Sequence, residues 1–584
     1  MGPVLSKRLL IAFVAFASSL GALAESRAVQ IDVSGEVIGS AGPNFMGLQY
    51  NGPTHLAIDP DSGQLTDFPS SYADPASRAA LTDAGIRAVR VFLDAPVVNP
   101  EQGVYDWADI DTAVDEIEAS GMAPMLVLHQ RDGGWHVGDA QNPWWNQQAG
   151  RDAWIDLAEQ AAIRYGARAP YFEILNEPNH IHPSSNSYMG FDLSADLFID
   201  AATEIHAQAP NAKVGGPASF GSWEPYTWAK RVLNRSGGEQ QLDFVSYHVY
   251  ATGSTNATDE DIFEMARWYE TVPQAIRDEL DAVSNKPIEL ALTEFNTSSV
   301  FQLNGELYTD PRNVDVTGGL VAALGWLYSA RGGADAVYRF GTTGGFGLIQ
   351  WPPDYELRPA YHAVRLLHEI GGLDDGAELL ETGLTLGEES HLEAFAIRNG
   401  DALSVVIVNT QASDAATVDL DLGISIDHLL DRYEYSEGRV TDSLTPYSQV
   451  AALGGMSQLS LPARSMTVLR ASQVIGDYNA DGVVDASDYT VWRDSIGQSV
   501  AAPFAGADGD GDGVITQGDY NVWRDQFGRE LAELSQVASS LSAAVPEPGG
   551  SCMALLAAIG LATRSVRRRS AQTQTAAATP RVRD

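Results

Sequence analysis

Short apolar runs alternate with longer amphipathic stretches through the first two thirds of the chain. In the stretches between the runs, apolar residues recur at i, i+3, i+4 and i+7 and Gly lies near the C-terminal end, as in helices that pack on a sheet; the clearest are 107–121, 151–166 and 358–372. The β-rich runs number eight, at 44–51, 86–93, 123–130, 169–176, 213–220, 242–250, 287–295 and 334–341. This alternation predicts an α/β fold, a (β/α)₈ TIM barrel. A doubly wound open sheet is the alternative, but no Gly-rich phosphate-binding turn follows the first run.

The pattern changes after Gly372. Runs such as 391–400, 402–410 and 465–472 alternate apolar and polar residues, with Gly, Asn and Asp between them. This period of two predicts an antiparallel β-sandwich over 375–472. The barrel is expected within 29–374, and the early run at 28–38 is a candidate to join the sandwich.

A third unit, 475–530, contains two copies of one pattern. The segments 477–497 and 508–528 align without a gap, and each is a D-x-[ND]-x-D-G loop that runs into a helix. Oxygen ligands at positions 1, 3, 5, 7, 9 and 12 with Gly at position 6 suit a seven-coordinate Ca²⁺. The expected ligands are Asp477, Asn479, Asp481, the Val483 carbonyl, Asp485 and Asp488 in the first loop, and Asp508, Asp510, Asp512, the Val514 carbonyl, Thr516 and Asp519 in the second.

Two features distinguish these loops from a complete EF-hand pair. Position 12 is Asp rather than Glu, and a single helix follows each loop. The unit therefore resembles a type I dockerin, a small α-helical module. The resemblance implies structural Ca²⁺ and a cohesin-like or cell-surface partner, although Ca²⁺ could serve only to fold the module.

Both ends of the chain look like processing signals. Residues 1–24 have a basic start, an apolar run and Ala22-Leu23-Ala24 before Glu25, which predicts a cleaved secretory signal. At the other end, 531–584 holds a linker, then Val545-Pro546-Glu547-Pro548, a short apolar run and an Arg cluster. That order resembles the PEP-CTERM sorting tails of bacteria. We expect a bacterial protein that is exported and is extracellular or associated with the cell surface.

Composition narrows the classes of partner. The formal net charge is −41 over 584 residues, which argues against nucleic-acid binding because that requires a basic surface. The only Cys is Cys552, so the expected mature body has no disulfide and relies on large apolar cores.

Two carboxylates stand where a barrel would use them. Glu177 follows the fourth predicted strand and Glu294 lies at the end of the seventh. The C-terminal strand ends of a barrel carry its active site, so the two side chains are expected to converge. A pair of carboxylates, one protonated and one ionised, is suited to cleavage of a glycosidic bond.

The motifs around these residues resemble those of the clan A glycoside hydrolases, retaining barrels with catalytic Glu residues on strands four and seven. "NEPN" at 176–179 and "TEFN" at 293–296 are most similar to family 39. The resemblance covers about 44–372, with a sandwich appended as in families 39, 51 and 30.

Matching residue by residue, the resemblance implies that Glu177 is the acid/base and Glu294 the nucleophile. Asn176 would bind the sugar 2-hydroxyl. Tyr250 would hydrogen-bond the nucleophile, and His248 would line the site near the acid/base. Arg90, on the second strand, would keep the nucleophile ionised through its fixed charge, or else serve as a structural ion-pair residue.

A few other residues near the predicted strand ends are candidates for binding sugar. His129 ends the third strand and is either a subsite residue or a hydrogen-bonded structural His. Trp144 and Trp145 follow that strand and either stack on sugar rings or pack in the core. Trp351, after the eighth strand, is a candidate floor for the subsite of the cleaved sugar.

These observations predict a secreted retaining glycosidase that acts on a polysaccharide or oligosaccharide and uses no metal or other cofactor in catalysis. The rival is a non-catalytic cell-surface carbohydrate-binding or adhesion protein on a degenerate barrel. An inverting hydrolase is a second rival, which a wide separation of the carboxylates would favour.

Overall fold

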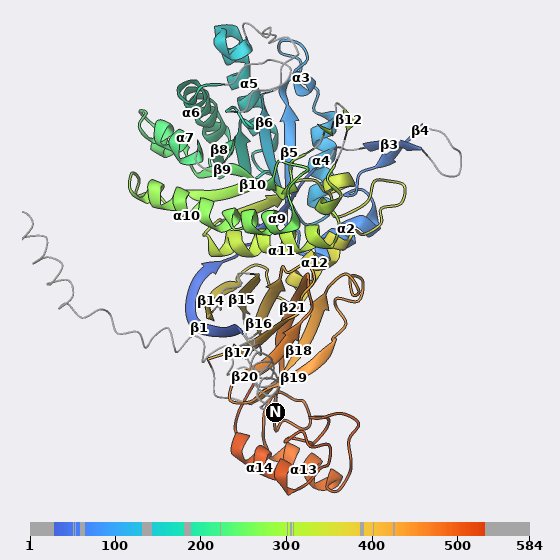
Figure 1. Cartoon of the computed structure of the whole chain (residues 1–584). Coiled ribbons are helices and arrows are strands. Elements are labelled where there is room, and N and C mark those ends of the chain that lie inside the picture. Colours follow the sequence, from blue (N-terminus) through green and yellow to red (C-terminus); the bar gives the residue numbers. More distant parts are fainter. Residues whose placement is uncertain are drawn as a thin grey trace, which may run out of the picture.

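Eight parallel strands close into a barrel in the computed structural model of the chain (Figure 1). The structure describes residues 29–50, 52, 54–58, 65–130, 143–179, 189–221, 224–300, 302–303, 306–307, 309–385, 391–400, 402–423 and 427–531. The predicted signal at 1–24 and the sorting tail after residue 531 lie outside these ranges. Among the described residues, no helix combines the length and apolar character that crossing a membrane requires.

All eight predicted barrel strands are present, and the TIM barrel is confirmed. Their order around the barrel follows the chain, with the last strand closing against the first. The strands are β2 (Met46–Gln49), β5 (Ala88–Asp94), β6 (Ala123–His129), β7 (Tyr171–Ile174), β8 (Lys213–Phe220), β9 (Phe244–Thr252), β10 (Glu289–Ser298) and β13 (Ala336–Arg339).

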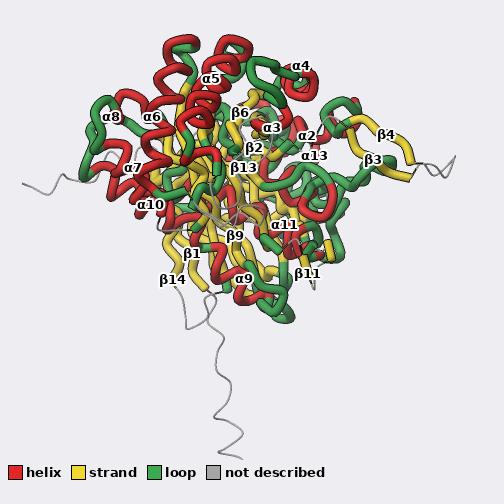
Figure 2. Tube along the Cα trace, turned by 90° about the horizontal axis from the view of Figure 1, so that it is seen from above, coloured by secondary structure: helices red, strands yellow, loops and turns green. Residues whose placement is uncertain are grey.

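Helices surround the barrel, and the three most periodic predicted segments are among them. These are α4 (Ala108–Ala119), α5 (Gln148–Tyr165) and α12 (Pro359–Glu369). The other helices of this unit are α2 (Pro75–Asp83), α3 (Ala95–Val98), α6 (Phe191–Gln208), α7 (Glu224–Leu233), α8 (Gly238–Gln241), α9 (Asp259–Ala266), α10 (Trp268–Asp281) and α11 (Val316–Arg331). A hairpin of β3 (Thr54–Ile58) and β4 (Leu65–Pro69) projects from the barrel (Figure 2).

The second unit is a single nine-stranded sheet, in the order β19-β18-β21-β16-β15-β14-β1-β17-β20. Its edge strands, β19 and β20, are joined by a tight turn, so the sheet folds back on itself as a sandwich. The strands are β1 (Val29–Ser40), β14 (Glu378–Thr385), β15 (Leu392–Asn399), β16 (Ala402–Asn409), β17 (Ala416–Asp421), β18 (His428–Tyr435), β19 (Ser448–Ala452), β20 (Met456–Leu461) and β21 (Ser465–Val474).

Strand β1 belongs to this β-domain, as the early run allowed, and the barrel proper begins at β2. The all-antiparallel prediction needs one correction. β1 pairs antiparallel with β14 but parallel with β17. β1 can pair in parallel because it is separated from β17 by the whole barrel, whereas strands joined by a hairpin must be antiparallel.

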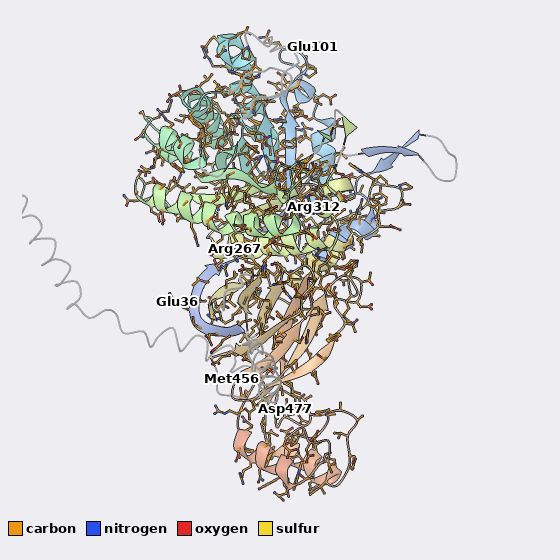
Figure 3. The ribbon with its side chains drawn as sticks, in the orientation of Figure 1. Glu36, Glu101, Arg267, Arg312, Met456 and Asp477 are labelled. Carbon is orange, nitrogen blue, oxygen red and sulfur yellow. The ribbon has the colours of Figure 1, made fainter. Side chains whose placement is uncertain are left out.

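Alternate residues of the β-domain face two different cores. On β15, Phe395 and Ile397 join the barrel core, whereas Ala394 and Ala396 join the core of the β-domain itself. Arg267 lies near the boundary between the barrel and the β-domain (Figure 3). It forms an ion pair with Glu393 of β15 across 2.6 Å. Both faces of β15 are therefore buried over most of its length, and its apolar run is accordingly nearly continuous rather than strictly alternating.

The third unit is built on α13 (Ala486–Ser495) and α14 (Gln517–Gln526). Its Val484 belongs to the apolar core of the β-domain, and Trp523 packs against that core. Gln526 also donates a 3.0 Å hydrogen bond to Asp427 of the β-domain. The helical module is therefore packed directly on the sheet.

Candidate active site

Inward-facing positions on the barrel strands change from apolar to polar towards the C-terminal ends. Ala88, Met125 and Phe244 form part of an apolar cluster that fills the lower barrel. Because side chains alternate along a strand, Arg90 follows Ala88 on the same face, and His248 follows Phe244. The polar layer therefore lies at the barrel mouth.

A β-bulge aims Glu294 into the barrel. Leu292 pairs with Tyr247 of β9, but the next pair joins Glu294 to His248, so Thr293 is an extra residue. Simple alternation from the inward-facing Ala291 would have turned Thr293 inward and Glu294 outward. The extra residue restores the inward direction of Glu294.

Glu177 is presented by an irregular segment after β7. Leu175 and Glu177 both adopt left-handed backbone conformations, with φ of 73° and 49°. The conformation costs about 1–2 kcal/mol for a residue with a Cβ, so contacts must hold it. Gln130 supplies two: its side chain accepts from the Asn176 amide at 2.7 Å and donates to the Asn176 carbonyl at 2.5 Å.

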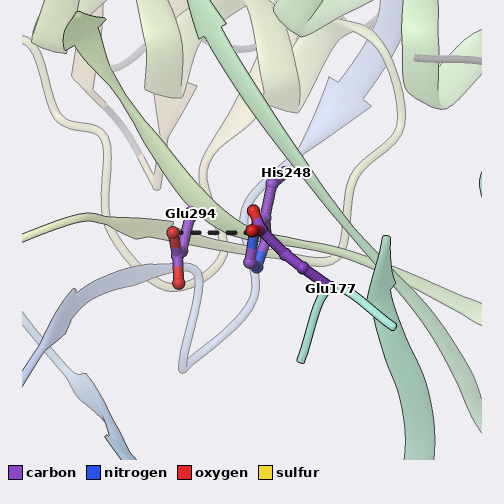
Figure 4. A group of neighbouring side chains, drawn as sticks. All are labelled: Glu177, His248 and Glu294. Carbon is purple, nitrogen blue, oxygen red and sulfur yellow. Dashed lines mark hydrogen bonds and ion pairs between the residues drawn. The ribbon is translucent and has the colours of Figure 1, made fainter. Parts of the chain in front are cut away.

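The two carboxylates converge on one histidine. Nδ1 of His248 lies 2.7 Å from Oε1 of Glu177 and 3.5 Å from Oε2 of Glu294 (Figure 4). Single ligand-type atoms of all three residues lie within 4.8 Å of one another. The two carboxylates therefore converge at one place in the barrel mouth.

Arg90 joins four side chains at the floor of the site. Its guanidinium donates to Glu173, Glu294, Asn176 and Gln49 over 2.6–2.9 Å. Burial alone would lower the pKa of Arg90, but the charges of Glu173 and Glu294 raise it above its usual value. The residue is therefore a fixed cation beside Glu173 and Glu294.

Tyr250 donates a 2.9 Å hydrogen bond to the other oxygen of Glu294. Burial, and then the charge of Glu294, raises the pKa of Tyr250 well above its usual value. The hydroxyl therefore keeps its proton and stays a donor. Glu294 thus receives a hydrogen bond on each of its oxygens.

His129 lies at the mouth and is held by Asp94, with Nδ1 2.6 Å from Oδ1. Its ring lies against Phe92, with the centroids 4.8 Å apart. Phe92 in turn covers Arg90, whose Cζ is 4.8 Å from the ring centroid. The His129 side chain is 15% exposed and bonded to Asp94, which agrees with the reading of a hydrogen-bonded structural His.

The three tryptophans predicted to bind sugar differ in exposure: two are buried and one is exposed. Trp144 and Trp145 are buried, and Trp144 stacks on Trp154 of α5. Their proposed role as sugar platforms is corrected, because no exposed indole face remains and core packing accounts for both. Trp351 is 44% exposed and lies against Gly344 after β13.

Three residues of the site escaped sequence analysis. Gln49, Gln130 and Glu173 lie inside apolar runs, and each contacts a residue that was predicted. The signal for Glu173 was a charged residue in the strand "YFEI", where burial demands a partner. Nothing in the sequence marked the two glutamines.

The helical module shows a local two-fold repetition. Nε1 of Trp492 donates to the Thr516 carbonyl, and Nε1 of Trp523 donates to the Asp485 carbonyl, each at 2.7 Å. The twelfth loop residues, Asp488 and Asp519, both accept from the backbone at the start of their helix. The two copies of the sequence pattern therefore make equivalent hydrogen bonds in the structure.

The second acidic loop fits a bound cation. Asp508, Asp510 and Asp519 each offer an oxygen within 4.8 Å of the others. Asp508 is buried, and its Oδ1 has no hydrogen-bond partner. A buried carboxylate oxygen without a partner is costly, and a metal ion would satisfy it.

Comparisons with known proteins agree with this geometry. The model of the glycosyl hydrolases family 39 matches residues 76–378, more than half of the chain. No curated protein sequence matches the chain.

Solved structures share the fold. An α-L-arabinofuranosidase from Thermotoga maritima aligns with 16% identity and a TM-score of 0.56, over 76% of this chain and 99% of its own. A monomeric β-xylosidase from Caulobacter crescentus aligns with 17% identity and a TM-score of 0.51, over 76% and 99%. The family 39 enzyme from Xanthomonas axonopodis pv. citri aligns with 15% identity and a TM-score of 0.50, over 77% and 99%.

A TIM barrel with two carboxylates facing each other at its mouth, matched by a family of glycosidases, defines the chain as a glycoside hydrolase. Its substrate is therefore a carbohydrate. The chain belongs to the glycosyl hydrolases family 39.

Proposed function

We propose that the protein is a retaining glycosidase in which Glu294 is the nucleophile and Glu177 the acid/base. The observation that carries the proposal is the approach of the two carboxylates, with oxygens within 4.8 Å. Retaining enzymes separate the two carboxyl groups by about 5–5.5 Å, and inverting enzymes by about 6.5–9.5 Å. Oxygens this close to one another support the retaining geometry over the wider inverting one.

The reaction would proceed in two displacements. Ionised Glu294 attacks the anomeric carbon while Glu177 gives its proton to the leaving oxygen, so the glycosidic bond breaks and a glycosyl ester forms. Glu177, now ionised, takes a proton from water, which attacks the same carbon and releases Glu294. Asn176, held by Arg90 at 2.6 Å, is positioned to bind the sugar 2-hydroxyl.

Removing the proton donor should produce a loss that depends on the leaving group. For Glu177→Ala we expect kcat/KM to fall about 10²–10⁴-fold on glycosides of poorly acidic alcohols. Glycosides of acidic phenols should lose far less in the first displacement, because their leaving oxygen needs little protonation. The measurement is kcat/KM over a series of leaving groups; a uniform loss would remove Glu177 from this role.

The sugar is open to direct assay. The solved neighbours are named as an arabinofuranosidase and a β-xylosidase, so a panel should begin with pentosides and continue through gluco-, manno- and galacto-configured substrates. The non-catalytic rival predicts binding without turnover on every member. The complete set of contacts around Glu294 argues against a decayed site.

We propose further that the two acidic loops bind Ca²⁺ as a structural ion and that the helical module is a dockerin-like unit for a cohesin-like or cell-surface partner. The orphaned Asp508 oxygen supports the ion. We also propose export through the N-terminal signal and sorting by the C-terminal tail, on the sequence patterns at 1–24 and 545–569.

Calcium removal should affect the helical module and spare the barrel. After chelation we expect residues 475–530 to become sensitive to protease while glycosidase activity persists, because the two proposed displacements need no metal. Calorimetric titration should give two ions per chain for the native protein and one for Asp508→Asn. Loss of activity on chelation would contradict the assignment and indicate a metal in the barrel.

A further inference from the structure

A cavity of about 500 Å³ opens beside His248 at the barrel mouth. His248 and Tyr250 form its inner end, and Phe220 of β8 and Trp268 of α10 form part of its lining. Its volume is in the range of sites that hold a small molecule. None of the roles assigned above uses this space.

One helical face lines the cavity. Asp261, Glu264, Met265 and Trp268 recur at i, i+3, i+4 and i+7 through α9 and into the first residue of α10. Residues at this spacing share a side of a helix. The face combines a flat indole with carboxylates, and all but Met265 are exposed.

Two large aromatic side chains in the lining are more exposed than packing requires. Trp268 is 41% exposed and Phe220 is 45% exposed. The apolar faces of sugar rings stack on exposed aromatic rings, while carboxylates accept hydrogen bonds from sugar hydroxyls. The cavity offers both kinds of contact together.

The cavity lies on the acid/base side of the site. The side-chain amide of Asn179, two residues after Glu177, bonds reciprocally to the backbone of Phe220: the Phe220 N–H donates at 3.0 Å, and the Phe220 carbonyl accepts at 2.7 Å. His248, at the inner end, contacts Glu177 directly. An acid/base must face the leaving oxygen, so the leaving group extends towards this side.

We propose that this cavity is a leaving-group subsite for a neutral sugar unit, stacked on Trp268 and Phe220 and hydrogen-bonded by Glu264. The assignment rests on the proposed role of Glu177. A neutral sugar is favoured over a uronic acid, because the carboxylates of Asp261 and Glu264 would repel a second anion. The natural substrate is then an oligosaccharide or polysaccharide with an uncharged residue after the scissile bond.

The test compares two substrates that share the glycone chosen by the panel. One is the glycosyl fluoride, whose leaving group is too small to enter the cavity; the other is a neutral disaccharide. For Trp268→Ala we expect kcat/KM on the disaccharide to fall about tenfold or more, with the fluoride within twofold of the native value. Ile163→Ala, an exposed side chain on the outer helix α5, is the control and should leave both values unchanged.

A charge change tests the selectivity separately. Glu264→Gln removes one carboxylate from the exposed helix face. We expect it to weaken turnover of the neutral disaccharide and to improve turnover of the matching disaccharide whose leaving residue is a uronic acid. The ratio of the two kcat/KM values should shift at least severalfold.

The outcomes separate the two proposals. If the native protein hydrolyses neither the fluoride nor any disaccharide, the proposed function fails. If it hydrolyses both and Trp268→Ala matches it on the disaccharide, the subsite is overturned while the catalytic assignment stands. Equal losses on fluoride and disaccharide would show that Trp268 supports the fold of the site, which also overturns the subsite.

Discussion

Glu294→Gln is expected to lower kcat by about 10⁴-fold or more, because an amide cannot form the glycosyl ester. The substitution keeps the size of the side chain, so Arg90 and Tyr250 still have an oxygen or an amide beside them. The native protein should also be labelled by a slow 2-fluoro glycoside, detected by mass spectrometry. The Glu294→Gln variant should not be labelled.

The chain carries its own matched control on the same strand. Glu289 begins β10 and forms an ion pair with Lys213, far from the mouth. Glu289→Gln should keep nearly full activity and lose little stability, because exposed ion pairs contribute about 0–1 kcal/mol. Comparable activity in the two variants would mean that another residue is the nucleophile.

Arg90→Met should mainly reduce stability. We expect the free energy of unfolding to fall by about 3–5 kcal/mol, because Glu173 would be left as a buried charge without its cation. Both side chains of this pair are 0% exposed, with 2.6 Å between the closest atoms. Denaturant unfolding followed by circular dichroism measures the loss.

Two further variants locate the cause of that loss. Adding Glu173→Gln to Arg90→Met removes the stranded charge and should recover a large part of the lost stability. Arg164→Met removes a cation that is 44% exposed and bonded to Asp111, and it should cost less than about 1 kcal/mol. If Arg90→Met alone unfolds like the native protein, Arg90 has no structural role in the floor of the site.

Periodicity predicted the barrel because each strand must bury both faces and each helix one. The same pattern placed the catalytic candidates at strand ends but could not establish their direction. On β10, simple alternation turns Glu294 away from the mouth, and only the extra Thr293 turns it back. A bulge is set by pairing with β9 and β13, a tertiary contact that local sequence does not express.

The sequence pattern also could not predict whether individual aromatic side chains are buried or exposed. Trp144 and Trp145 lie in a loop, where exposure is the usual expectation, yet the short turn they form packs under α5. Trp268, which the structure exposes beside the site, is the first residue of α10, and no sequence pattern marked it as a site residue. In both cases the neighbouring element decides the exposure.

The position of β1 in the sheet has a consequence for synthesis. β1 is synthesised before the other described strands, yet its partners β14 and β17 come after the whole barrel. Ser34 and Glu381, which bond across the first pair, are 347 residues apart. Domains fold in order as they are made, so the barrel can form while β1 still has an unsatisfied edge. A shortened chain that ends after the barrel would keep that edge exposed permanently, and aggregation is its expected fate.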